Sequence, residues 1–116
     1  MFDYYLKSHK AMINLMHYDE APRVDFAFDG RKMYSSGSVE IIHLRLKPDE
    51  RLDKHTNKLT TVFYVLEGTS LLETDQKAVQ LKANDCVEVA ANTPRCLFNN
   101  SVHDFRVLVI KKLKGD

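Results

Sequence analysis

The sequence lacks the 18-residue apolar run that a membrane-spanning helix requires. Its first ten residues, MFDYYLKSHK, are interrupted by Asp3 and Lys7, where a secretory signal needs an unbroken apolar segment. Net charge is also nearly absent, at +1, and no basic patch for nucleic acid or an anionic membrane is indicated. These absences predict a soluble, cytoplasmic protein without a nucleic-acid or membrane partner.

Cysteine is scarce as well. Cys86 and Cys96 form no CxxC element, and no histidine pair stands at zinc-finger spacing, so two reduced, partly buried thiols are predicted. What is present, 116 residues with 44% hydrophobic and 28% charged side chains, is typical of one globular domain spanning residues 1–116.

From residue 39 onward, short apolar segments alternate with turn-forming residues. No stretch of ten or more residues there shows a helical stripe, so parallel βαβ units are excluded and an all-β sandwich or barrel of about seven strands is predicted. The predicted strands are 39–46, 60–66, 70–74, 78–81, 86–89, 95–98 and 102–112.

The first 38 residues carry a weaker pattern. Val24, Phe26 and Phe28 alternate with other residues and predict a strand that enters a hairpin turn at Asp29-Gly30. Earlier apolar residues are compatible with either a short helix or an edge strand. We therefore place the barrel core at about 22–112, with 1–21 as an N-terminal extension or dimer-contact segment.

The segment LDKHTNKLTTVFYVLEG, residues 52–68, resembles the first motif of the cupin superfamily. That motif runs Gly, five residues, His, one residue, His, three or four residues, Glu, six residues, Gly. Counting back from Gly68 places His55, Asn57 and Thr61 where the family has His, His and Glu.

The segment NDCVEVAANTPRCLFN, residues 84–99, is similar to the second cupin motif. Asn84 and Asn92 stand at its glycines, and asparagine tolerates the left-handed backbone that such turns need. Arg95 stands at its histidine, and its closing Asn is kept as Asn99. The resemblance implies an all-β, cupin-type double-stranded antiparallel β-helix, also called a jelly-roll barrel.

In the family, three imidazoles and one carboxylate hold a divalent iron, manganese, zinc or nickel ion. Of these positions only His55 is kept, because Asn57 and Thr61 are weak neutral donors and Arg95 repels a cation. No metal cofactor is therefore expected. The alternative is a divalent transition metal held at His55, with His43 or His103 as replacement ligands.

Strand alternation keeps 55 with 57, and 61 with 63, on the same side of their strands. We therefore predict a ligand-binding cluster of His55, Asn57, Thr61 and Arg95 inside the barrel. Its ligand would be a small carboxylate, phosphate or sugar-like molecule, with Arg95 as charge partner and His55 as hydrogen-bond donor or proton shuttle. His55 is the one candidate catalytic residue, and whether the protein is an enzyme stays open.

Several alternatives remain at this point. Arg95 would otherwise lie at the surface or pair with Asp85 or Glu67, and His55 would have no chemical role. His43 is expected to face solvent or a partner subunit, and the lysines near the end of the chain, such as Lys111, to form a solvated tail.

Two other functions compete with ligand binding. One is a metal-dependent dioxygenase, decarboxylase or isomerase, and the other is a dimerisation or structural module whose barrel is filled by Phe63, Phe98 and Phe105. The resemblance implies a homodimer, for which the apolar residues Val39 and Ile41 offer a contact surface.

Overall fold

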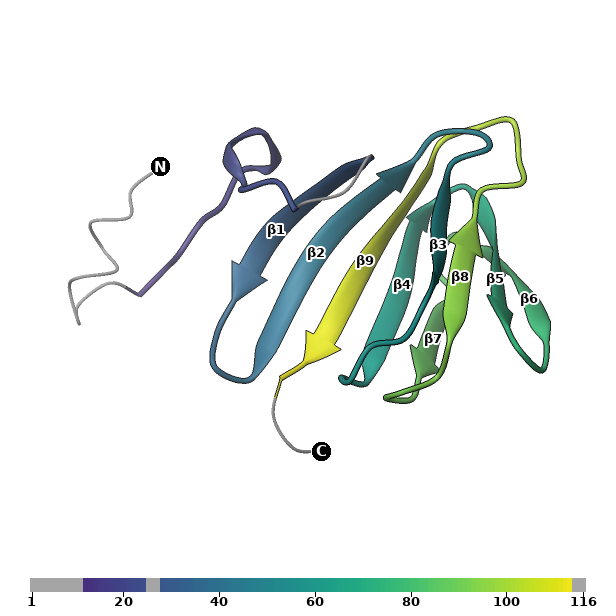
Figure 1. The fold of residues 1–116 in the computed structure, drawn as a ribbon. Coiled ribbons are helices and arrows are strands. Elements are labelled where there is room, and N and C mark those ends of the chain that lie inside the picture. The colour runs from purple at the N-terminus through teal and green to yellow at the C-terminus, as the bar shows by residue number, and fades with distance from the viewer. Residues whose placement is uncertain (1–11, 25–27, 114–116) are drawn as a thin grey trace.

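The computed structural model describes residues 12–24 and 28–113. Within these residues the chain forms two antiparallel sheets that face each other (Figure 1). The strands are β1 (Asp29–Ser35), β2 (Val39–Leu46), β3 (Arg51–His55), β4 (Thr61–Glu67), β5 (Thr69–Thr74), β6 (Ala78–Lys82), β7 (Cys86–Val89), β8 (Arg95–Phe98) and β9 (Phe105–Lys112), preceded by the 3-10 turn η2 (Tyr18–Glu20). The prediction of an all-β fold is confirmed.

The two sheets divide the strands unequally. One sheet has the order β1-β2-β9-β4-β7, and the other has the order β3-β8-β5-β6. In the larger sheet β9 pairs with β2 along its whole length and with β4 on its other side, so a strand from the end of the sequence lies at the centre (Figure 1).

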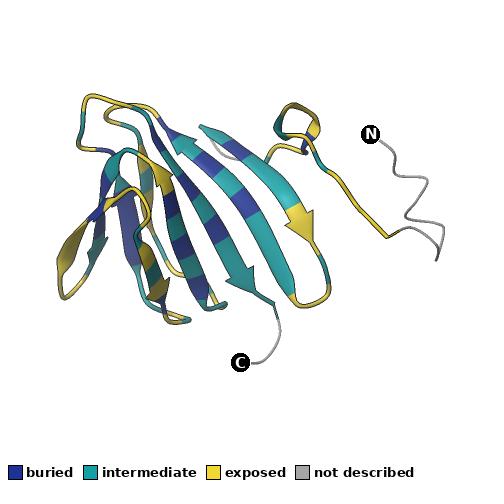
Figure 2. Cartoon of the chain, turned by 180° about the vertical axis from the view of Figure 1, so that it is seen from behind, coloured by how far each residue is buried: buried dark blue, intermediate teal, exposed yellow. Residues whose placement is uncertain are grey.

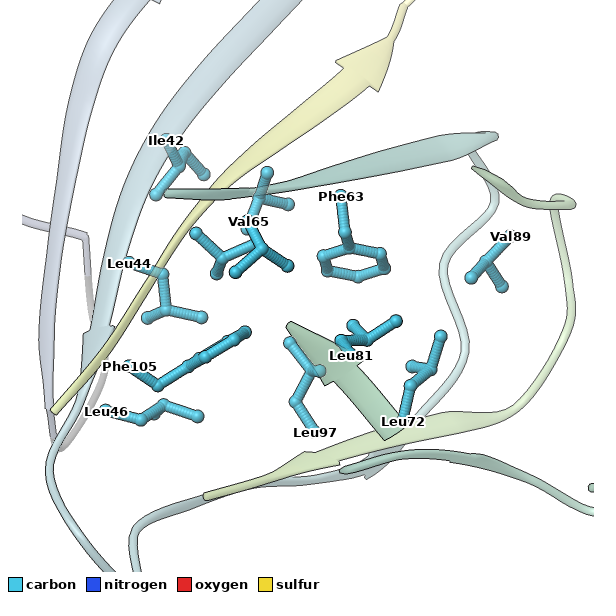
Figure 3. Packing of buried hydrophobic residues seen from close by; sticks show 12 residues of the cluster. Ile42, Leu44, Leu46, Phe63, Val65, Leu72, Leu81, Val89, Leu97 and Phe105 are labelled. Carbon is cyan, nitrogen blue, oxygen red and sulfur yellow. The ribbon is translucent and has the colours of Figure 1, made fainter. Parts of the chain in front are cut away.

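The core lies between the sheets because β2, β4 and β9 alternate apolar and polar residues at the period of a strand. The buried positions form bands on the strands (Figure 2), and their side chains meet in one cluster (Figure 3). Phe63 and Phe105 belong to it, as predicted. The prediction that Phe98 helps to fill the interior is wrong, because Phe98 is half-buried beneath the Arg51 guanidinium, 4.3 Å from its ring centre.

The turns behave as the two motifs predict. Asn84 and Asn92 both have left-handed backbone, with φ of 74° and 65°, so asparagine takes over the role of glycine. Gly68 also has positive φ, and a Cβ placed there would lie 2.3 Å from the carbonyl oxygen of Asp104. Buried Asn99 donates to the carbonyl oxygens of Leu46 and His103 at 2.9 and 2.8 Å, and so holds three chain segments together.

Three strand predictions are wrong in part. Asp29 and Gly30 do not form a hairpin turn but begin β1, while residues 25–27 lie outside the described residues. The last strand begins at Phe105 rather than at residue 102, because residues 101–103 form a bend. The segment Arg51–His55, outside the seven predicted strands, is strand β3, and it ends at His55, so Asn57 lies in the following loop rather than on a strand with His55.

The outer face of β2 is covered by the chain's own η2 turn. Tyr18 packs edge-on against His43 with ring centres 4.8 Å apart, and its hydroxyl donates a hydrogen bond to Asp29. His43 thus lies on the outer face of β2, as expected, but Tyr18 covers it, so the side chain is half-buried rather than open to solvent. Burial, reinforced by the charge of Arg106, lowers the pKa of His43 below its ordinary value.

The described part of the chain contains no helix with the length and apolarity needed to cross a bilayer. Both cysteines are free, with Cys96 buried and Cys86 exposed. The expectation of two partly buried thiols is therefore wrong for Cys86, and Cys96 is buried rather than partly buried.

Candidate functional site

A small cavity opens at the end of the sandwich where β4 and β8 begin and β3 and β9 end, the lower end in Figure 1. Its volume is about 30 Å³, enough for two or three water-sized groups. It is lined by Ile42, Leu44, Leu52, His55, Asn57, Thr61, Phe63, Arg95, Val109 and Lys111. All four residues of the predicted cluster are thus brought together around one cavity.

Arg95 lies at the start of β8 and is only 2% exposed. Its Nη1 donates to the carbonyl oxygen of Thr93 at 3.0 Å, and its Nη2 donates to Thr61 Oγ1 at 2.9 Å. Its Nε is buried without a hydrogen-bond partner among the described residues. Burial lowers the pKa of Arg95, but a guanidinium in a protein keeps its proton, so a positive charge is held inside the barrel.

This guanidinium has no counter-charge in the part of the chain that the structure describes. The ion pairs found there, within 4.0 Å, do not include Arg95. None of the described residues that line the cavity carries a carboxylate. A buried charge without an opposite charge is unfavourable, so the Arg95 guanidinium lowers the stability of the folded chain.

Thr61 and Asn57 position the polar side of the cavity. Thr61 is fully buried, and its hydroxyl accepts from Arg95 while lying 3.3 Å from the carbonyl oxygen of Leu59, to which it donates. The Asn57 side-chain oxygen accepts from the Leu59 backbone N–H at 2.9 Å, which leaves its Nδ2 group as a donor. The backbone oxygen of Asn57 also accepts from Asn92 at 2.7 Å, linking the two motif turns.

His55 ends β3 directly opposite Arg95 in the strand register. Its Nδ1 lies 2.9 Å from the carbonyl oxygen of Asp53. Because a carbonyl oxygen only accepts, Nδ1 carries the hydrogen, and in the neutral ring Nε2 is the proton acceptor. His55 thus brings an acceptor to a cavity whose other polar groups are mainly donors.

Lys111 is a cavity residue that the sequence reasoning missed. The prediction of a solvated tail is wrong for Lys111, because it lies in β9 beside Thr61 of β4 and its side chain is only 24% exposed. Its Nζ lies 3.9 Å from the carboxylate of Glu40. The available signal was parity, since 111 falls on the same face as Phe105, Val107 and Val109, which are buried.

The two surface alternatives for Arg95 are wrong. Arg95 is buried rather than solvent-exposed, and neither carboxylate suggested as its partner contacts it. Asp85 pairs with Lys82 at 3.2 Å, and Glu67 pairs with Arg106 at 3.4 Å.

The cavity residues do not fit a transition metal. Within 12–24 and 28–113, no group of three or more His, Cys, Asp or Glu side chains is close enough to share an ion. His43 and His103 do not line the cavity that contains His55. A cation beside His55 would also face the buried charge of Arg95 across the strand pair.

The sequence and the fold both point to one family. The sequence model of the cupin domain family matches residues 42–111, which is more than half of the chain. The chain belongs to the cupin domain family. No curated protein sequence matches this cupin.

Solved structures share the cupin's fold at low sequence identity. The polyketide cyclase RemF from Streptomyces resistomycificus superposes with a TM-score of 0.77 at 16% identity, over 89% of this chain and 81% of that chain. An RmlC-like cupin family protein with a double-stranded β-helix fold from Methanocaldococcus jannaschii gives 0.71 at 20% identity, over 89% and 91%. KdgF from Halomonas sp. gives 0.76 at 13% identity, over 89% and 97%. These likenesses confirm the double-stranded β-helix.

Proposed function

We propose that this cupin binds a small anionic metabolite at the mouth of its barrel, with Arg95 in the place of the metal ion. The observation that carries this proposal is a buried guanidinium without a counter-charge among the described residues and with an unpartnered Nε. An anion entering the cavity supplies both the missing charge and the missing acceptor. A charge-assisted hydrogen bond of this kind is stronger than one between neutral groups.

The shape of the cavity limits what binds. Its volume of about 30 Å³ accepts a carboxylate or a similar acidic group, but not a whole sugar ring. Since His55 and Asn57 are only half-buried, the remainder of a larger ligand projects between them towards solvent. The walls formed by Leu44, Phe63 and Val109 are apolar, so the bound acidic group is largely shielded from water.

The neighbouring polar groups favour particular ligands. Asn57 Nδ2 donates to the ligand, whereas His55 Nε2 in its neutral form accepts. A hydroxy acid or a hydrogen phosphate has both an anionic oxygen for Arg95 and a hydroxyl for His55. We therefore propose that the protein binds small organic acids or acid phosphates.

A calorimetric titration of chelator-treated protein with small organic acids and phosphates tests this function. The expected result is saturable binding of at least one acid, with the affinity falling at least tenfold in Arg95→Gln. Arg51→Gln is the matched control, because Arg51 lies on β3 beside β8 but contacts Cys96 and Phe98 outside the cavity. Binding that survives in Arg95→Gln, or that requires one equivalent of a divalent metal, would refute the proposal.

A further inference from the structure

We propose that Lys111 is a second cation of the anion site and that the cavity prefers anions with two negative charges over singly charged anions of the same size. This inference rests on the proposed function and adds to it the charge of the ligand. It depends on three features of the described residues: the placement of Lys111, its link to Arg95 through Thr61, and the charge balance around Glu40.

Lys111 reaches the cavity through the geometry of the larger sheet. It is opposite Thr61 in the register of β9 and β4, and both residues line the cavity. Thr61 Oγ1 in turn accepts from Arg95 Nη2 at 2.9 Å. The two cations thus lie on either side of one buried threonine, on strands of opposite sheets.

Glu40 does not neutralise Lys111 fully. Glu40 lies 3.2 Å from Lys32 Nζ but 3.9 Å from Lys111 Nζ, so it is shared and its shorter contact is with Lys32. Two lysines against one carboxylate leave about one positive charge at this edge of the cavity. Arg95 adds a second, and Glu40 itself does not line the cavity.

One uncompensated positive charge, on Arg95, and one partly compensated charge, on Lys111, lie at the same cavity and distinguish anions by charge. A monoanion satisfies the buried Arg95 and gains little from Lys111. A dianion gains from both, and the gain is large at a site partly removed from water because screening is weaker there. An anion that draws Lys111 away does not leave Glu40 unpaired, since Lys32 remains beside it.

Oxalate and oxamate form a suitable pair of probes. They have the same number of heavy atoms and similar shape, but an amide replaces one carboxylate in oxamate. With chelator-treated protein at constant ionic strength, we expect oxalate to bind at least tenfold more tightly than oxamate. In Lys111→Gln the ratio of oxalate affinity to oxamate affinity should fall to about two or less, mainly through loss of oxalate affinity. Lys111→Arg should restore the ratio.

Two further variants control for general charge and for Glu40. Lys82→Gln also removes one positive charge, but its side chain is 75% exposed on β6, so it should leave the ratio unchanged. Glu40→Gln should tighten oxalate binding, because Lys111 then has no competing carboxylate. Urea unfolding of each variant shows whether the fold is intact.

The outcomes separate this inference from the proposed function. If Arg95→Gln abolishes binding of both probes but Lys111→Gln leaves their ratio unchanged, the anion site stands and the role of Lys111 is refuted. If folded wild-type protein binds neither probe nor inorganic phosphate, both are refuted. A ratio that falls equally in Lys82→Gln would show a non-specific charge effect and also overturn the inference.

Discussion

Replacing Arg95 by methionine should make the ligand-free protein more stable. The substitution keeps an unbranched side chain in the space between the sheets. It removes the positive charge of a residue that is only 2% exposed and that has no counter-charge among the described residues. The effective cost of burying such an ion is several kcal/mol. Against this, the acceptors on Thr93 and Thr61 each lose one hydrogen bond, worth about 1 kcal/mol.

The difference predicts a net stabilisation of about 1–3 kcal/mol. For a chain of 116 residues this raises the melting temperature by about 4 °C for each kcal/mol. Urea and thermal unfolding, followed by circular dichroism, measure this change in stability. The buffer should have low ionic strength and contain no multivalent anions. Arg51→Met, which removes a cation outside the cavity, is the control and should not be stabilised.

A bound anion should stabilise wild-type protein more than the variant and so oppose this difference. At a free-ligand concentration of 100 times the wild-type dissociation constant, wild-type protein gains about 2.7 kcal/mol, whereas Arg95→Met, with an affinity at least tenfold lower, gains at most about 1.4 kcal/mol. The reasoning is refuted if Arg95→Met destabilises the ligand-free protein by more than about 1 kcal/mol, since Arg95 would then be a structural residue.

Two further predictions concern the fold. Burial lowers the pKa of His43, so below a pH of about 6.5 the unfolded chain binds a proton that the folded chain does not. The unfolding free energy should therefore fall as the pH drops below about 6.5, by at most about 1.4 kcal/mol per pH unit. His43→Phe should flatten this slope in urea titrations between pH 7.5 and 5, and an unchanged slope would contradict the assignment. Gly68→Ala should cost about 2–5 kcal/mol of unfolding free energy, because the added Cβ meets the Asp104 carbonyl oxygen at positive φ. Gly37→Ala, whose Cβ meets nothing within 4 Å, should change it by less than 1 kcal/mol, and equal losses in the two variants would refute the steric argument.

The parts of the fold that were predictable are those in which one face of a strand is buried. β2 alternates along its whole length, so its limits were predicted correctly, as were those of β7 and β8. β3 has no buried residue in its five, because it lies at the edge of its sheet, and its sequence RLDKH carries no alternation. β1 was missed because it begins with Asp-Gly, which more often forms a turn.

The candidate site was predictable only where a motif fixed positions. The spacing back from Gly68 placed His55, Asn57 and Thr61, and the second motif placed Arg95, all of which line the same cavity. The sequence alone does not reveal that Arg95 is buried, because it does not show whether a carboxylate lies close enough to pair with Arg95 at the surface. Lys111 belongs to neither motif, and only the pairing of β9 with β4 brings it beside Thr61.

The central claim is that Arg95 binds an anion directly, in the place where the family holds a metal. Nitrogen-15 NMR of the arginine Nε–H groups in chelator-treated protein tests it, with the Arg95 signal assigned by its loss in Arg95→Met. The account predicts that this signal shifts saturably as oxalate or phosphate is added, while the Arg51 signal stays in place. A signal that does not move with any acid, or that moves only after a divalent metal is added, would contradict the account.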